Sequence, residues 1–166
     1  MTEITNHSNQ ALIGFAQGIR CGNLALALPY GWARMVVDEF SVTAVPRAPF
    51  WLLGASSING TVTPVVDLQL FALGPNAAQD SGARKKRRLL VGGIADGESN
   101  KTLAILFDDL PIQIDPSAEV MSAQDAGFAQ FGQALTGQIV RQRETVYRML
   151  APETLYEVLT TQLSRH

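Results

Sequence analysis

The chain has little of what most catalytic and metal sites are built from. Cys21 is its only cysteine, and it has two histidines among 166 residues. A single cysteine excludes an intramolecular disulfide and a zinc site made of paired thiolates, and it favours a reducing compartment, which we expect to be the cytoplasm. His7 lies in a polar N-terminal stretch and His166 is the last residue, so we expect neither to be held with the accuracy that catalysis requires. No cofactor and no metal are expected.

Long apolar runs and an excess of one charge are missing as well. Glycine, proline or a charged residue interrupts every apolar run before the roughly 20 residues that a membrane-spanning helix needs, so we expect no membrane insertion. The net charge is -2 and 17% of residues are charged, which provides no overall basic field for nucleic acid. With 46% hydrophobic residues, the chain is expected to form a flexible tail over residues 1–11 and one domain over residues 12–163.

What the sequence does contain is many short strand patterns separated by turn residues. Gly22-Asn23 and Asn59-Gly60 are pairs that favour tight hairpin turns. We predict hairpins over residues 12–28, 50–68, 89–110 and 135–150, strand pieces within 34–45, a loop over 74–82 and a long mobile connection over 117–133. Between Leu24 and Leu28, leucines alternate with alanines, so both faces of that strand can pack closely.

One helix is predicted, at the C-terminus. Pro152 and Glu153 suit a first helical turn. Four apolar residues then share one helical face, and this face is expected to cover the domain's own core: Leu155, Val158, Leu159 and Leu163. Nine or ten short strands without βαβ alternation, followed by one helix, predict an all-β barrel assembly.

Candidate catalytic groups are few and poorly placed. Asp108 and Asp109 are adjacent on a predicted strand and should point to opposite faces. Cys21 ends an apolar strand, where a buried structural thiol is the usual outcome. The glycines of Val91-Gly92-Gly93 lack the spacing of phosphate-binding loops. These patterns indicate a protein that is not an enzyme, with a small hydrolase as the least favoured alternative.

A basic run is the most conspicuous charge feature. It consists of Arg84, Lys85, Lys86, Arg87 and Arg88. Such a run can meet RNA, an anionic lipid surface or an acidic partner, although a solvated loop and strand edge is the commoner case. No aromatic residues are interleaved with it, which argues against stacking on nucleic acid. A small β-barrel that binds nucleic acid or a ligand through residues 84–88 is therefore the alternative function.

The segment over residues 44–54 and the following one over 57–68 carry a family resemblance. They read AVPRAPFWLLG and SINGTVTPVVDL, with a proline, a bulky apolar pair and a glycine, then a turn that ends in glycine, then Pro-Val-Val-Asp-Leu. This order resembles the signature of CheW-like coupling proteins. Residues 15–29 resemble the family's first hairpin and residues 103–108 a later strand, so the resemblance covers about Leu12 to Leu159.

This resemblance implies a fold, partners and a site. The fold would be two small SH3-like five-stranded β-barrel lobes that share a hydrophobic core, followed by the short C-terminal helix. The function would be a non-enzymatic adaptor that couples the regulatory domain of a CheA-type histidine kinase to the cytoplasmic tip of methyl-accepting chemoreceptors, and that reaches the membrane through receptor complexes. The groove that binds these partners would include Met35, Val36, Gly54, Ile58, Asn59 and Gly60.

Two positions depart from the family pattern. The family usually has an acidic residue where this chain has Met35, and an arginine before the turn glycine where it has Asn59. The resemblance would place these two side chains opposite each other in a groove between the two barrel lobes. The departures indicate a divergent branch, such as the coupling proteins of type IV pilus twitching motility.

Overall fold

The computed structural model describes residues 16–80, 86–93, 95–96, 99–115, 118–122 and 129–165. The strands are β1 (Ala16–Cys21), β2 (Leu24–Pro29), β3 (Ala33–Val37), β4 (Leu52–Ile58), β5 (Thr61–Val66), β6 (Arg87–Gly92), β7 (Ala95–Asp96), β8 (Ser99–Asn100), β9 (Leu103–Gln113), β10 (Glu119–Ser122), β11 (Leu135–Gln142) and β12 (Thr145–Leu150). The helices are α2 (Leu68–Leu73) and α3 (Pro152–Ser164), with 3-10 turns η1 (Pro75–Asp80) and η2 (Ala129–Ala134).

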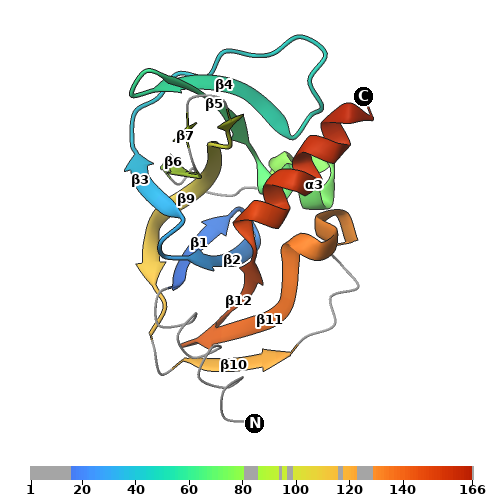
Figure 1. The fold of residues 1–166 in the computed structure, drawn as a ribbon. Coiled ribbons are helices and arrows are strands. Elements are labelled where there is room, and N and C mark those ends of the chain that lie inside the picture. Colours follow the sequence, from blue (N-terminus) through green and yellow to red (C-terminus); the bar gives the residue numbers. More distant parts are fainter. Residues whose placement is uncertain are drawn as a thin grey trace.

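The strands build two lobes that share β9. In the described part of the chain, ten strands form one sheet in the order β10-β11-β12-β2-β1-β9-β5-β4, and β6 branches from β9 to carry β3. Lobe 1 contains β10, β11, β12, β2 and β1, and lobe 2 contains β3, β6, β5 and β4 (Figure 1). The first half of β9 pairs with β5 and β6, whereas its second half pairs with β1. One continuous strand therefore runs through both lobes.

Three apolar clusters follow from the alternation of side chains along the strands. On β2, Leu24 to Leu28 sends its leucines into a cluster shared by both lobes and its alanines into the core of lobe 1. On β9, Leu103, Ile105 and Phe107 join the shared cluster, while the residues between them enter the core of lobe 2. The expectation of a common hydrophobic core is confirmed, and the two-sided packing predicted for β2 is its cause.

The lobes are not closed barrels, which corrects one part of the expectation. The path of strands ends at β10 and at β4. Between β3 and β4 the chain makes one isolated bridge, Thr43 to Ala55, so only Thr43 of the strand predicted near residues 42–45 pairs at all. Pro46 and Pro49 follow directly, and proline cannot donate to a strand ladder. In antiparallel register with Ala55, these prolines face the start of β4 and end the pairing there. On the other side of the bridge, residues 56–58 of β4 have no strand partner on this edge in the described part of the chain, and lobe 2 is open along this seam between β3 and β4.

The four predicted hairpins are confirmed, but two connections contain more structure than expected. The predicted loop over residues 74–82 includes η1, and α2 precedes it. Asp67 begins α2, because its Oδ1 accepts a hydrogen bond from the Leu70 amide at 3.1 Å. The connection predicted over residues 117–133 contains β10 and the first part of η2. The prediction of a long connection without regular structure is therefore wrong at these two elements. Residues 123–128 lie outside the described part.

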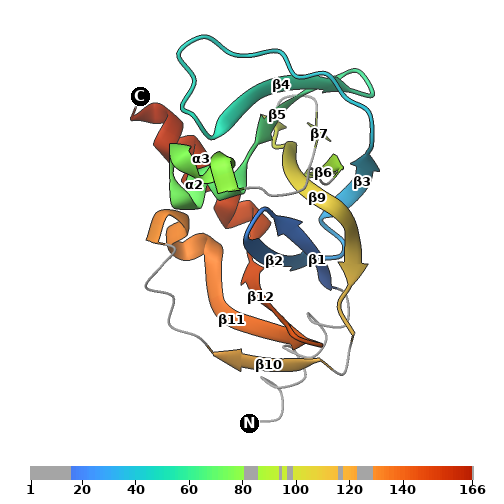
Figure 2. The same ribbon diagram turned by 180° about the vertical axis from the view of Figure 1, so that it is seen from behind.

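Helix α3 packs its apolar stripe on the domain itself, as predicted. Leu155 and Leu159 are buried in the shared cluster and Val158 packs against it, whereas Leu163 is 39% exposed. Seen from behind, α2 and α3 lie at the same edge of the molecule (Figure 2), and both contribute to the shared cluster. Neither of these two helices is long and apolar enough to cross a membrane.

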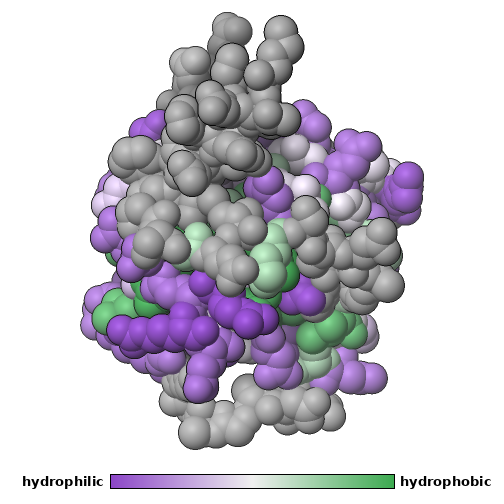
Figure 3. All heavy atoms as spheres, turned by 90° about the horizontal axis from the view of Figure 1, so that it is seen from below, coloured by the Kyte–Doolittle hydropathy of each residue, from purple (hydrophilic) through white to green (hydrophobic). Residues whose placement is uncertain are grey.

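Among the described residues at the end of lobe 1, the apolar surface is divided into small areas (Figure 3). On the face seen from below, hydrophobic residues among the coloured atoms form small separate areas within a mainly hydrophilic surface (Figure 3).

Two glycines test this description of lobe 2. A Cβ atom at Gly54 would lie 2.2 Å from the Thr43 carbonyl oxygen, whereas one at Gly60 would meet no atom within 4 Å. Both glycines have positive φ, +147° and +81°. Gly54→Ala should lower the free energy of unfolding by about 2 kcal/mol or more, and Gly60→Ala by about 1 kcal/mol. Denaturant unfolding measures both. Equal effects would contradict the close approach of Thr43 to Gly54.

Candidate functional site

A groove of about 660 Å³ occupies the open seam of lobe 2. Met35 and Val37 line it from β3, Phe40 from the following loop, and residues 55–59 from β4 and its turn. The apolar side chains Met35, Val37 and Phe40 pack against the core of lobe 2 and form its floor. The groove therefore combines an apolar floor with the edge of β4, to which one isolated bridge joins Thr43 of the loop after β3.

Met35 and Asn59, the two positions that depart from the family pattern, meet in this groove. The Asn59 Nδ2 donates toward the Met35 Sδ at 3.9 Å. Asn59 and Gly60 have φ of 50° and 81°, as a type I′ hairpin turn requires. This turn joins the paired residues Ile58 and Thr61 and holds the Asn59 side chain beside β3. The two side chains are therefore neighbours, but they meet within lobe 2 and not in a groove between the lobes, which corrects the expected location.

The other predicted site residues have different surroundings. Ile58 lines the groove and is 9% exposed. Val36 is 37% exposed but lies outside the described lining, because neighbouring side chains on a strand point to opposite faces. Gly54 is buried and allows Thr43 to reach Ala55, with N–H···O distances of 2.8 and 2.9 Å. Gly54 therefore shapes the groove rather than lining it.

The loop after β3 supplies groove residues that sequence reasoning missed. Glu39, Phe40, Ser41 and Thr43 all line the groove. Their segment has no regular period, so no pattern could assign them a face. The one signal in the sequence is the stretch of small residues at 54–57, which allows another backbone to approach β4 but does not show which one.

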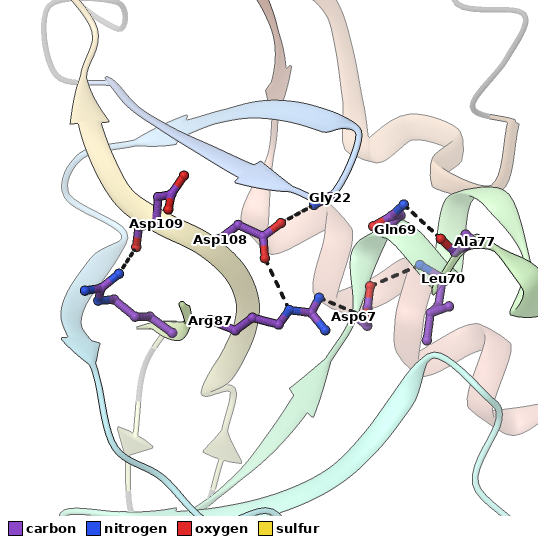
Figure 4. A network of polar contacts seen from close by, with 9 residues as sticks. Gly22, Asp67, Gln69, Leu70, Ala77, Arg87, Asp108 and Asp109 are labelled. Carbon is purple, nitrogen blue, oxygen red and sulfur yellow. Dashed lines mark hydrogen bonds and ion pairs between the residues drawn. The ribbon is translucent and has the colours of Figure 1, made fainter. Parts of the chain in front are cut away.

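A second polar feature ties the lobes together at the centre of the molecule. Arg87 on β6 contacts Asp67 Oδ2 at 3.3 Å and Asp108 Oδ1 at 3.2 Å, so it lies between the two carboxylates (Figure 4). Asp108 Oδ2 also accepts a hydrogen bond from the Gly22 amide at 2.8 Å. The Asp67 side chain is 6% exposed and that of Asp108 15%. We call Asp67, Arg87, Asp108 and Gly22 the interlobe network, because Gly22 belongs to the β1–β2 turn of lobe 1.

Ion pairs within the domain engage part of the predicted basic run. Arg87 serves two carboxylates, and the Arg88 Nε contacts Asp38 Oδ1 at 2.7 Å. Lys86 is exposed, while Arg84 and Lys85 lie outside the described residues. Two of the five basic side chains are thus committed to partners within the domain.

The candidate catalytic groups have structural roles. Cys21 is 1% exposed, and burial raises the pKa of its thiol far above the usual range, with the nearby carboxylates of Asp67 and Asp108 adding to the rise. The thiol therefore stays protonated at neutral pH. Asp108 belongs to the interlobe network, and Asp109 has φ of 63°, which breaks the regular alternation expected there. In the portion of the chain described, no group of three His, Cys, Asp or Glu residues could hold a metal ion.

Comparison with known proteins assigns the family. The model of the CheW-like domain matches residues 17–159, which include the groove, the interlobe network and both lobes. The chain belongs to the CheW-like family. The CheW-like fold also accounts for the two SH3-like lobes, since the chain is similar to the scaffolding protein TtCheW from Thermoanaerobacter tengcongensis at a TM-score of 0.58. The two are 18% identical over 82% of this chain and 87% of that one. A search of curated proteins found no match.

Replacement of Arg87 should destabilise the fold, because it leaves buried carboxylates without their cation. Arg87→Ala leaves Asp67, 6% exposed, without its ion-pair partner, and an unpaired buried charge is strongly destabilising. Because Arg87 itself is 43% exposed, solvent screens part of the interaction, and we expect a loss of about 2 kcal/mol in the free energy of unfolding. Lys86→Ala is the matched control, with an expected change within about 0.5 kcal/mol. Similar values for both variants would contradict the role of the network.

The contact between Met35 and Asn59 can be measured by a double-mutant cycle. Met35→Glu and Asn59→Arg should each lower stability, and the double variant should recover part of the loss, with a coupling of about 0.5 kcal/mol or more. The cycle cancels the cost of placing arginine at a positive φ, which occurs in both the single and the double variant. Met35→Glu combined with Gln133→Arg, at an exposed position of η2, is the control and should be additive. Additivity in both pairs would show that the two groove positions do not interact.

Proposed function

We propose that this CheW-like protein is a non-enzymatic adaptor that couples a CheA-type histidine kinase to chemoreceptors, and that the groove of lobe 2 is one of its docking surfaces. The observation that carries the proposal is the open seam between β3 and β4. The floor is apolar, and among the described residues the outer edge of β4 is paired only at Ala55. A partner protein can cover such a surface by side-chain packing and by main-chain pairing.

The chemistry of the groove supports binding rather than turnover. Its floor is apolar and its rim carries short polar side chains such as Ser57 and Asn59. Hydrophobic centres with polar rims are the usual anatomy of protein interfaces. The buried, protonated Cys21 and the ion-paired Asp108 leave these two groups without the free, activated state that catalysis requires.

An adaptor needs a second surface for its second partner, and exposed apolar residues outside the groove can supply it. Tyr30 is 55% exposed, Leu110 62% and Val36 37%, and none of them lines the described groove. We infer that the kinase regulatory domain and the receptor tip use different faces. Met35 and Asn59 in place of a charged pair favour a divergent member of the family, such as the type IV pilus branch.

The alternative of nucleic-acid binding through residues 84–88 loses support. Arg87 and Arg88 neutralise Asp67, Asp108 and Asp38 within the domain, so these two cations would have to leave their carboxylates before they could bind phosphates. We therefore do not propose this function.

A binding experiment tests the groove. Ser57→Arg places a long cation on the exposed rim of the groove, and we expect it to weaken binding to the purified regulatory domain of a CheA-type kinase by about tenfold or more, as a buried interface charge without a partner would. Gln133→Arg, exposed on η2, adds the same charge away from the groove and should bind like the natural protein. Isothermal titration calorimetry measures the affinities, and thermal unfolding verifies that both variants are folded.

Two outcomes would contradict the proposal. If the natural protein binds neither the kinase domain nor a soluble receptor fragment, the adaptor function is wrong. If it binds the kinase domain and Ser57→Arg binds equally well, the adaptor function stands and the groove is not the docking surface.

A further inference from the structure

A second cavity, of about 560 Å³, lies between α3 and the end of the β6–β9 hairpin. Its aromatic lining residues are Trp32 and Tyr156. Leu103 and Pro152 are buried apolar residues of the lining. The acidic residues Glu153 and Glu157 line it from α3. It shares no described lining residue with the groove of lobe 2. It is therefore a separate site, which the function proposed above does not use.

The glycine pair at the end of β6 builds the aromatic wall of this cavity. A Cβ atom at Gly92 would lie 2.5 Å from the Trp32 ring, so the indole rests directly on the strand backbone. Gly93 has φ of +96°, and a Cβ there would lie 2.1 Å from the Lys101 carbonyl oxygen. These glycines have no phosphate-binding spacing, and their structural role is to seat Trp32 and to bring Lys101 close. The aromatic wall is thus held in place before any ligand arrives.

The charges around the cavity favour a cation. Glu153 and Glu157 lie one helical turn apart on α3 and are both exposed, so their carboxylates face the same side. Among the described residues, neither carboxylate has an ion-pair partner. Lys101 is the one described cation in the lining, which leaves a formal charge of -1 from two carboxylates and one ammonium. The hydroxyls of Thr160 and Thr161 donate to backbone carbonyls of α3.

We propose that this cavity binds an arginine side chain presented by a partner protein. A guanidinium group stacks on aromatic faces and pairs with carboxylates through its planar fork, whereas an ammonium group is a compact, strongly hydrated charge. Trp32 and Tyr156 provide the aromatic faces, and Glu153 and Glu157 provide the carboxylates. The apolar floor of Leu103 and Pro152 accommodates an aliphatic residue next to the arginine. The recognised segment therefore carries arginine flanked by leucine or a similar residue.

The two tryptophans make the test specific. Trp32 lines the cavity, while Trp51 is 5% exposed in the shared cluster and serves as an internal control. We would titrate the full-length protein with acetyl-Leu-Arg-Leu-amide and follow both indole N–H signals by NMR. The Trp32 signal should shift and saturate, and the Trp51 signal should stay in place. Acetyl-Leu-Glu-Leu-amide, the matched anionic probe, should produce no saturable shift of Trp32.

Surface variants then separate charge recognition from simple apolar binding. Glu157→Gln should lower the affinity for the arginine peptide by about threefold or more, because charge-assisted contacts are lost. The double variant Glu153→Gln/Glu157→Gln should lower this affinity by about tenfold or more. Lys101→Ala should strengthen it, because a like charge is removed. Glu144→Gln, exposed in the β11–β12 turn, removes one charge elsewhere and should leave the affinity unchanged.

Three results would overturn the inference. Failure of the arginine peptide to shift Trp32 would show that the cavity is not such a site. Equal binding to the double variant would show that the carboxylates take no part. Stronger binding of the glutamate peptide, lost in Lys101→Ala, would show that the cavity selects anions. None of these results bears on the kinase-binding test of the groove.

Discussion

Burial of both faces of the first half of β9, from Leu103 to Phe107, is the constraint on which the rest of the fold depends. Ile105 and Phe107 enter the cluster shared by the lobes, while Ala104 and Leu106 enter the core of lobe 2. The same strand continues into lobe 1, where it pairs with β1. A strand with apolar residues on both faces cannot lie at a surface without exposing one of them. Neither lobe can therefore complete its core alone, and the two lobes should unfold as one cooperative unit.

The interlobe network adds direction to this non-directional packing. Arg87 pairs with Asp67 and Asp108 within lobe 2 and the shared strand β9, which holds the Asp108 carboxylate in place. The Gly22 amide joins the same carboxylate, and a Cβ at Gly22 would overlap the Gln69 side chain of α2, so the β1–β2 turn sits directly against lobe 2. Buried ion pairs contribute little net stability but can specify one geometry. Here that geometry is the relative position of the lobes, and with it the spacing of any surfaces that they present.

How far the sequence predicts this structure depends on how local each determinant is. The turns at Gly22-Asn23 and Asn59-Gly60 are set by their own residues, so their hairpins were predictable, as was the leucine–alanine alternation of β2. Helix α2 has six residues, too few for a helical period to show, and its Asp67 cap resembles any strand-end aspartate. The loop that lines the groove and the seating of Trp32 on Gly92 depend on contacts between distant segments, which no local pattern records.

The open seam of lobe 2 follows from the chain between β3 and β4. A free strand edge is a liability, because it invites pairing with any extended segment. Residues 38–51 cover part of the edge, since Thr43 and Ala55 exchange two backbone hydrogen bonds. Pro46 and Pro49 prevent this pairing from continuing toward the start of β4. What remains open is bounded on one side by this bridge and on the other by the Asn59-Gly60 turn, with Met35 between them. For the docking function that we propose, an edge of limited length with fixed ends would admit only a segment of matching length, so that incomplete closure of the lobe would give selectivity as well as access.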